Sequence, residues 1–304
     1  MRVLANVGVI PGSVGTGITK VAVVTSGDSR VPMVFVPGFW HGAWCWSRVL
    51  EGLSSDRRTL AVDLLGQGLY ARVPATVHTR PFDPAAFASE RSPIADVTLD
   101  DSAALLVDQI RTFAADRPVA LVAHSFGGVV ATRVVEQIPE MIGHVAYVAA
   151  MMPTDGCSGI EILDAPEQEG ELLAAALVGD PLVIGASRID TGSETTRKQL
   201  REALYQDVEP GTVETAISLL STDAPLGTAV GTTTATENGW GSVPRTYVRC
   251  RHDRSILLGM QDRLIREADE RFPANPTRVV TLDTGHSPFL ADPAALTRVL
   301  RDLT

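Results

Sequence analysis

Short apolar runs alternate with stretches of helical periodicity along most of the chain. The runs are continuous, and Gly, Pro or charged residues bound them. This pattern is typical of strands that are buried on both faces of a parallel sheet. It predicts strands at residues 31–36, 59–63, 119–123, 144–149, 246–250 and 278–282.

The segments between these runs repeat their apolar residues at helical spacing. Thr98 can cap the start of one such segment, and the acidic residues Asp100 and Asp101 suit its first turn. The pattern predicts helices at residues 98–113, 128–138, 260–272 and 293–303. Strands that alternate with helices indicate the α/β fold class, with a mostly parallel central sheet flanked by helices.

Two stretches interrupt this alternation. Residues 70–97 hold four prolines and predict a long loop. Residues 154–243 lack strong strand runs and carry short helical patterns at residues 167–178, 194–205 and 212–220. We therefore predict a core of residues 1–153 and 244–304, with residues 154–243 inserted in it as a helical cap. The Gly- and Val-rich residues 1–30 predict one or two edge strands.

Composition and charge narrow the class of protein. The chain has 304 residues, of which 45% are hydrophobic, and this proportion fits a globular protein. Its net charge of -10, without a basic run, argues against binding to nucleic acid or to an anionic membrane surface. No apolar run reaches the roughly 18 residues of a membrane span, and the apolar start is short for a signal peptide. We expect a soluble, cytoplasmic protein.

The cysteines indicate neither a disulfide framework nor a zinc site. Cys45, Cys157 and Cys250 are odd in number, scattered along the chain, and form no CxxC pair. We expect three reduced thiols and no bound metal, since the isolated His252 near Cys250 does not make a ligand set.

The candidate nucleophile is Ser125, in the sequence Ala-His-Ser-Phe-Gly-Gly at residues 123–128. It lies between a predicted strand and a predicted helix, where small flanking residues permit a strained turn that exposes the serine hydroxyl. The helix that follows favours developing negative charge at its N-terminus. The motif departs from Gly-x-Ser-x-Gly only in having Ala123 as its first residue.

A nucleophilic serine needs a base, and the base needs an acid that orients it. His286 lies between the last predicted strand and the last predicted helix, and it is the expected base. Asp253 follows the preceding strand and is the expected acid, which gives the chain order Ser, Asp, His. Asp155 and Asp283 are the alternative acids.

Two further groups complete the candidate site. The backbone amides of Phe39, in the turn after the first strand, and of Phe126 can converge as an oxyanion hole. Trp40, His124 and Trp240 are the candidate substrate-binding residues. Ordinary packing is the alternative interpretation for His124 and Trp240.

The sequences His-Gly-Ala-Trp-Cys-Trp (41–46), His-Ser-Phe-Gly-Gly (124–128) and Gly-His-Ser (285–287) resemble a known family. They are similar to the plant methylesterase and hydroxynitrile lyase group of the α/β-hydrolase superfamily and to its bacterial esterase relatives. The resemblance covers nearly the whole chain and implies the α/β-hydrolase fold. The lyases of that group carry a threonine in the first oxyanion loop and a lysine directly after the catalytic histidine. Gly38 and Ser287 stand at those positions here, which favours ester hydrolysis.

We therefore predict a serine hydrolase that cleaves a small or medium apolar carboxylic ester or lactone through an acyl-enzyme. Two alternatives stay open: a cofactor-free lyase or cyclase that uses the same triad, and a ligand receptor with slow or no turnover. The expected partner is a small-molecule substrate, and no metal or organic cofactor is expected. The resemblance adds a homodimer formed through the cap as an option for assembly.

Overall fold

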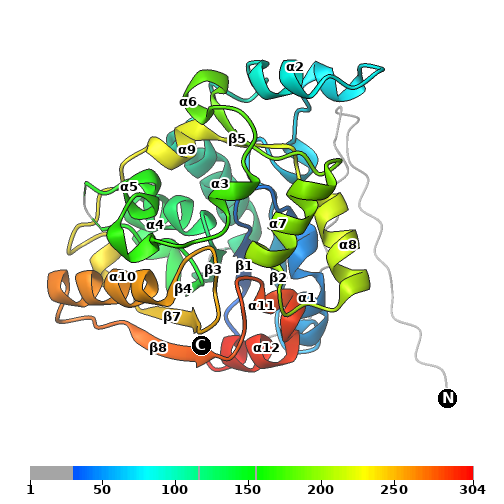
Figure 1. Cartoon of the computed structure of the whole chain (residues 1–304). Coiled ribbons are helices and arrows are strands. Elements are labelled where there is room, and N and C mark those ends of the chain that lie inside the picture. Colours follow the sequence, from blue (N-terminus) through cyan, green and yellow to red (C-terminus); the bar gives the residue numbers. More distant parts are fainter. Residues whose placement is uncertain (1–29, 116, 155, 304) are drawn as a thin grey trace, which may run out of the picture.

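A six-stranded parallel sheet forms the centre of the molecule (Figure 1). The structure is a computed structural model, and it describes residues 30–115, 117–154 and 156–303. The strands are β1 (Met33–Val36), β2 (Thr59–Ala61), β3 (Val119–His124), β4 (Ile142–Val148), β7 (Arg245–Cys250) and β8 (Arg278–Leu282). Their order is β2-β1-β3-β4-β7-β8, and each neighbouring pair is parallel. All six strands predicted between residues 31 and 282 are confirmed. The edge strands were predicted within residues 1–30, and residues 1–29 of that stretch lie outside the described residues.

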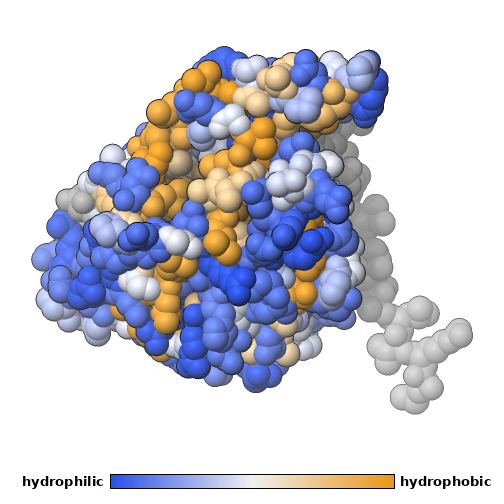
Figure 2. All heavy atoms as spheres, viewed as in Figure 1, coloured by the Kyte–Doolittle hydropathy of each residue, from blue (hydrophilic) through white to orange (hydrophobic). Residues whose placement is uncertain are grey.

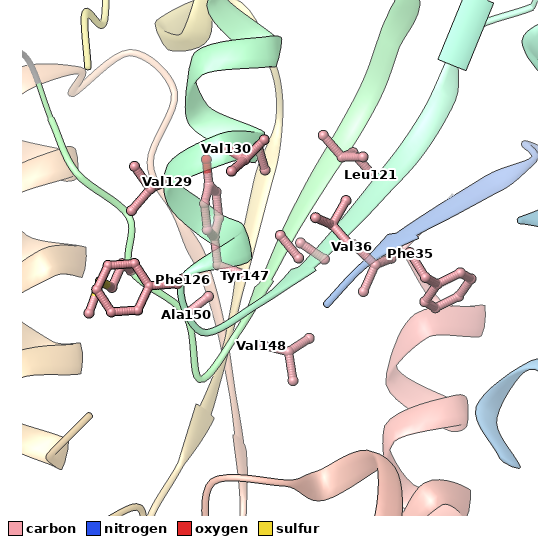
Figure 3. Close-up of a cluster of buried hydrophobic side chains, with 14 of the residues drawn as sticks. Phe35, Val36, Leu121, Phe126, Val129, Val130, Tyr147, Val148 and Ala150 are labelled. Carbon is pink, nitrogen blue, oxygen red and sulfur yellow. The ribbon is translucent and has the colours of Figure 1, made fainter. Parts of the chain in front are cut away.

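Strand β1 and residues 119–123 of β3 are apolar throughout because both faces of the sheet are covered. Every residue of β1 and β3 is buried, and the two strands pair from Met33 with Ala120 to Val36 with Ala123. Figure 3 shows Phe35 on one side of these strands and Val129 and Val130 on the other. A strand covered on both faces has no polar position, which explains the continuous runs in the sequence.

Two groups of helices provide this cover. α3 (Leu99–Ala114) packs on α4 (Gly127–Gln137), and α1 (Ser47–Leu53) packs on α11 (Pro288–Ala291) and α12 (Pro293–Arg301). α4 and α1 lie on opposite sides of β1 and β3 in Figure 1. α10 (Leu258–Arg271) packs against β7. The four predicted helices are confirmed, and most of their ends differ from the predicted ends by one or two residues.

The start of α3 shows how local sequence fixes a helix end. The Thr98 hydroxyl accepts a hydrogen bond from the Asp101 amide at 3.1 Å, and the Asp101 carboxylate accepts one from the Thr98 amide at 3.0 Å. This reciprocal pair satisfies two amides that have no partner within the helix. The cap predicted at Thr98 is therefore present.

The chain between β4 and β7 contains the insertion, residues 154–243. Its helices are α5 (Gly159–Leu163), α6 (Pro181–Ile184), α7 (Glu194–Leu204), α8 (Pro210–Leu219) and α9 (Leu226–Val230). It also holds a two-stranded antiparallel ribbon of β5 (Ala186–Arg188) and β6 (Asp223–Pro225), which corrects the expectation of helices alone. These strands have three residues each, too few to produce a periodic signal. The division of the chain into a core and a separate cap stays a prediction.

The helix predicted at residues 167–178 is wrong. Two 3₁₀ turns, Pro166–Gln168 and Ala174–Ala176, occupy this segment instead. Gly170 between them has φ +92°, a conformation that ends a helix, and the Glu171 carboxylate accepts from the Leu173 amide. The loop predicted at residues 70–97 likewise contains a short helix, α2 (Pro84–Ser89). Further 3₁₀ turns are Ala43–Trp46, Gly68–Tyr70, Ala75–His78, Pro139–Met141 and Trp240–Ser242.

A buried ion pair anchors the β5–β6 ribbon. The Arg188 guanidinium donates to both carboxylate oxygens of Asp223 at 2.7 Å, and both side chains are fully buried. The Ser92 hydroxyl donates to the same carboxylate at 2.6 Å, and Arg188 also donates to the Glu90 carbonyl at 2.8 Å. The pair thus joins the insertion to the long loop that contains α2.

The surface of the insertion exposes apolar side chains. Leu182 and Val183 of α6 are 75% and 68% exposed, and Val230 of α9 is 44% exposed. Figure 2 shows apolar residues gathered over α6 and α9 in the upper part of this face. Within the described part of the chain, no helix has both the length and the apolar character to cross a membrane.

We expect the variant Asp223→Ala to lose about 3–5 kcal/mol of unfolding free energy, because it leaves the buried Arg188 guanidinium without its carboxylate. Urea denaturation followed by circular dichroism measures this loss. The control is Asp96→Ala, which removes the exposed Arg91–Asp96 pair and should leave the transition unchanged. An equal effect of the two variants would contradict the anchoring role.

Candidate active site

The strand order places the candidate site at the carboxyl ends of β1 and β3. The chain leaves β1 toward β2 on one side of the sheet and later returns to place β3 on the other side of β1. Such a reversal opens a crevice at the ends of the two strands, where ligands bind in open α/β sheets. The loop that follows β1 begins at Pro37, and the turn that follows β3 begins at Ser125.

Ser125 occupies a strained turn between β3 and α4. Its φ is +52°, in the left-handed region, and its carbonyl accepts from the amides of Gly128 and Met151 at 3.0 Å each. A Cβ atom on Gly127 would lie 2.4 Å from the Pro37 carbonyl oxygen, and one on Gly128 would lie 2.0 Å from the Met151 carbonyl oxygen. The two glycines are therefore required by space. The Ser125 hydroxyl itself makes no hydrogen bond to any residue that the structure describes.

His286 and Asp253 form a buried hydrogen-bonded pair. The distance from His286 Nδ1 to Asp253 Oδ2 is 2.8 Å, and the other carboxylate oxygen accepts from the amides of Ser255 at 2.7 Å and Ile256 at 2.9 Å. A carboxylate accepts hydrogen bonds, so in the neutral ring the proton is on Nδ1 and the lone pair is on Nε2. This tautomer is the one that a general base requires.

The alternative acids do not take this place. Asp283 is 74% exposed at its side chain and pairs with Arg251 at 3.2 Å and with His252 at 3.0 Å. Asp155 lies outside the described residues. The structure thus joins His286 to Asp253, the acid that the chain order favours.

His124 connects the histidine loop to the serine turn. Its Nε2 atom lies 2.9 Å from the His286 carbonyl oxygen, and the two rings are 4.6 Å apart. Because a carbonyl can only accept, His124 donates through Nε2–H, and burial holds its pKa well below the usual range. The side chain is fully buried. Its contacts are with the His286 carbonyl and with neighbouring rings, and the substrate binding expected of it stays a prediction.

The amides of Phe39 and Phe126 are free beside Ser125. Neither amide donates to a protein acceptor among the described residues. Their two rings stack in parallel, with centroids 3.8 Å apart. Gly38 permits the approach of the first loop, because a Cβ atom there would lie 2.6 Å from Ser125 Cβ and 3.2 Å from Ser125 Oγ. The site therefore combines two unused amide donors with an apolar aromatic wall.

Trp40 joins the first loop to the insertion. Its φ is +61°, again in the left-handed region. The indole Nε1 atom donates to the Ser187 carbonyl at 2.8 Å, and the Trp40 carbonyl accepts from the Ser221 amide at 2.8 Å. Both partners belong to the insertion, so these two hydrogen bonds hold Trp40 in this conformation.

Trp240, by contrast, does not lie with Ser125. It is fully buried, its indole donates to the Tyr147 hydroxyl at 2.7 Å, and the Arg245 guanidinium stacks on its ring. The Trp240 amide is bonded to Glu136, in the third turn of α4, roughly 15 Å along the helix from the serine turn. Trp240 is a core residue, and the prediction that it lines the pocket is corrected.

His41 is a residue whose role the sequence did not reveal. Its Nδ1–H donates to the Phe39 carbonyl at 2.8 Å, and its Nε2 atom accepts from the Tyr205 hydroxyl at 2.7 Å. Burial lowers the pKa of His41 to about 4, against the effect of this carbonyl bond, so the ring is neutral at pH 7. Nothing in the sequence around Tyr205 signals this contact, since it joins residues far apart in the chain.

The rest of the described chain offers no metal site and one groove of note. No group of three or more His, Cys, Asp or Glu side chains within residues 30–303, gaps excepted, is arranged to hold a metal ion. A surface groove of about 270 Å³ lies between α5 and α10, lined by Cys157, Glu161 and Arg263 among others. It lacks the serine, histidine and aspartate described above and lies apart from them.

Comparisons with known proteins agree with this architecture. Residues 33–299 match a family described as the alpha/beta hydrolase family. Methylesterase 9 of Arabidopsis thaliana is 26% identical over 273 residues, which cover 86% of this chain and 94% of that protein. Norfluorocurarine synthase 1 of Strychnos nux-vomica is 26% identical over 278 residues, which cover 89% of this chain and 94% of that protein.

A solved structure shows the same fold. The crystal structure of the methylesterase MES16 from Arabidopsis superposes with a TM-score of 0.66 at 22% identity. The superposition covers 90% of this chain and 98% of that one. At this identity the likeness concerns the fold.

The neutral state of His41 predicts how stability depends on pH. The unfolded chain takes up a proton on His41 near pH 6.5, whereas the folded chain does so only near pH 4. The contribution of neutral His41 to the free energy of unfolding is therefore fully present above about pH 6.5 and is lost as the pH falls toward 4. Between pH 7 and pH 5, His41 should account for about 2 kcal/mol of that loss.

Two measurements check this prediction. The ring protons of His41 should titrate near pH 4 in NMR spectra. In the variant His41→Gln, the drop in unfolding free energy between pH 7 and pH 5 should be about 2 kcal/mol smaller than in the unmodified protein. Titration of the ring near pH 6.5, or an unchanged pH dependence in the variant, would contradict the argument.

Proposed function

The chain belongs to the alpha/beta hydrolase family, and from this membership and the geometry around Ser125 we propose that it is a serine hydrolase of carboxylic esters. The observation that carries the proposal is the buried pair of His286 and Asp253, 2.8 Å apart, bonded through His124 to the turn that holds Ser125. A nucleophile, a base and an acid in this chain order are the components of acyl transfer.

In the first half of the reaction, Ser125 Oγ attacks the ester carbonyl carbon and its proton passes to His286 Nε2. The negative charge that develops on the carbonyl oxygen is stabilised by the amides of Phe39 and Phe126. Each such donor contributes about 3–4 kcal/mol of barrier reduction in enzymes of this type. Asp253 keeps the ring oriented and stabilises the positive charge that it acquires.

In the second half, His286 gives its proton to the leaving alcohol, and an acyl ester with Ser125 remains. A water molecule then loses a proton to His286 Nε2 and attacks the acyl carbon. The carboxylic acid departs as the proton returns to Ser125 Oγ. Every proton in this cycle passes through Nε2, because the hydrogen bond to Asp253 occupies Nδ1.

Two features support an apolar ester or lactone as the substrate. The stacked rings of Phe39 and Phe126 flank the serine with apolar surface, and a relative is named as a methylesterase. Cyanohydrin cleavage is less well served, because Ser287 is fully buried and supplies no positive charge for a cyanide leaving group. Its hydroxyl has no protein hydrogen-bond partner in the described ranges.

A non-hydrolytic reaction is the second candidate, and the similarity to norfluorocurarine synthase 1 favours it. In that case the same pair, His286 and Asp253, would move a proton without water entering the product. Product formation without uptake of labelled oxygen from water would select this alternative. A small-molecule substrate and a homodimer formed through the insertion stay predictions.

The variant Ser125→Ala tests the proposed nucleophile. We expect kcat/KM for p-nitrophenyl acetate to fall by about 10³-fold or more, because the acyl-enzyme can no longer form. Labelling of the protein by a fluorophosphonate should disappear with it. The control is Ser102→Ala, which changes a buried serine of α3 and should keep both activity and labelling.

Full activity in Ser125→Ala would refute the proposal. Tight binding of a ligand by the unmodified protein, without turnover and without fluorophosphonate labelling, would instead identify a ligand receptor.

A further inference from the structure

Three consecutive side chains of the insertion reach three different loops at the sheet edge. Tyr205, Gln206 and Asp207 directly follow α7, and we call them the 205–207 tripeptide. Tyr205 Oη donates to His41 Nε2 at 2.7 Å, Gln206 Nε2 donates to the His252 carbonyl at 2.7 Å, and Asp207 Oδ2 accepts from the Gly285 amide at 2.6 Å. These partners belong to the loops that follow β1, β7 and β8 respectively.

The Tyr205 contact bears on the first loop. Tyr205 is fully buried, and it can donate to His41 only while the ring is neutral and protonated at Nδ1. That same Nδ1–H holds the Phe39 carbonyl at 2.8 Å. The chain of two hydrogen bonds therefore fixes the Phe39–Trp40 peptide, which directly follows the peptide that carries the Phe39 amide, one of the proposed oxyanion donors.

The Gln206 contact bears on the acid loop. The carbonyl that accepts from Gln206 belongs to His252, which directly precedes Asp253. The end of α7 holds this loop at a second point, since the Ser255 hydroxyl donates to the Ala203 carbonyl at 3.1 Å. Ser255 in turn donates its amide to the Asp253 carboxylate. The insertion therefore bonds the acid loop at the residue before Asp253 and at the residue two positions after it.

The Asp207 contact bears on the histidine loop. The Gly285 amide that donates to Asp207 directly precedes His286. The approach is close, because a Cβ atom on Gly285 would lie 2.2 Å from Gln206 Nε2 and 2.9 Å from Asp207 Oδ1. A side chain at position 285 would therefore have to displace the ends of the Gln206 and Asp207 side chains.

We propose that the 205–207 tripeptide positions the proposed catalytic groups relative to one another, by bonding the three loops that carry Phe39, Asp253 and His286. The inference rests on the proposed function, which it deepens. Its physical basis is that the sheet fixes the strand ends, while the side chains beyond them must be held within about 0.5 Å for efficient chemistry. The three residues act through the loops, so they are positioning residues.

The Asp207 contact offers the sharpest test, because a matched pair of variants separates its hydrogen bond from its charge. Asp207→Ala removes the acceptor, and kcat for an ester should fall about tenfold while KM stays within about twofold. Asp207→Asn keeps an oxygen that accepts from the Gly285 amide, and it should restore kcat to within about threefold of the unmodified protein. Tyr205→Phe should resemble Asp207→Ala.

The control variant is Ser193→Ala, at the opposite end of the same helix. The Ser193 hydroxyl caps α7 by accepting from the Thr196 amide at 3.4 Å and touches none of the three loops. It should leave kcat unchanged even if α7 becomes less stable. An equal loss of kcat in Ser193→Ala, an effect of Asp207→Ala on KM alone, or no restoration by Asp207→Asn would overturn the proposal.

A second readout separates this proposal from the proposed function. The proton on His286 Nδ1 should give a low-field NMR signal that persists in Asp207→Asn and is lost to solvent exchange in Asp207→Ala. If the unmodified protein hydrolyses no ester, the proposed function fails, and this signal alone decides the positioning role. An unchanged signal in Asp207→Ala would refute positioning, whatever the activity.

Discussion

Close contact between main-chain segments at the carboxyl ends of β1, β3 and β4 is the constraint on which the candidate site depends. Trp40, Ser125 and Ala149 follow these three strands, and each has a positive φ. Such conformations cost about 1–3 kcal/mol each and persist only when their surroundings enforce them. Around Ser125 the enforcement is steric, since a side chain at Gly127 or Gly128 would collide with a neighbouring carbonyl, and hydrogen bonds to the insertion hold Trp40. The strained turn places Ser125, which is 7% exposed, at the point where the loops converge.

Burial at this edge has an electrostatic consequence for the histidines. The rings of His41 and His124 lie near His286, and burial keeps both of them neutral. Each donates one N–H to a main-chain carbonyl, of Phe39 and His286 respectively, so each tautomer is fixed. Neutral neighbours do not oppose a positive charge on His286 as strongly as imidazolium ions would. The buried Asp253 carboxylate is therefore the charged group that His286 contacts directly.

The fold, and the meeting of the candidate site residues at one edge of the sheet, could be predicted from sequence because both follow from local patterns. Continuous apolar runs identify the strands, and the position of Ser125, Asp253 and His286 after successive strands brings them to one edge. Trp240 was placed incorrectly because burial against the third turn of α4 has no local signature. The β5–β6 ribbon could not be predicted for a related reason. Its strands are three residues long, and a charged pair, Arg188 with Asp223, holds it where apolar residues would be expected.

The contacts of the insertion bear on how such a fold can change its substrate. If the insertion made no contact with the loops of the site, it could be replaced by another segment without disturbing the geometry around Ser125. Yet Ser187 and Ser221 bond Trp40 in the first loop, and the 205–207 tripeptide bonds the loops on which the histidine and its acid lie. A replacement insertion that fits a new substrate must therefore also supply equivalent hydrogen bonds at these points. The positioning proposed for the 205–207 tripeptide therefore leaves the rest of the insertion as the part that can change its side chains without losing these hydrogen bonds.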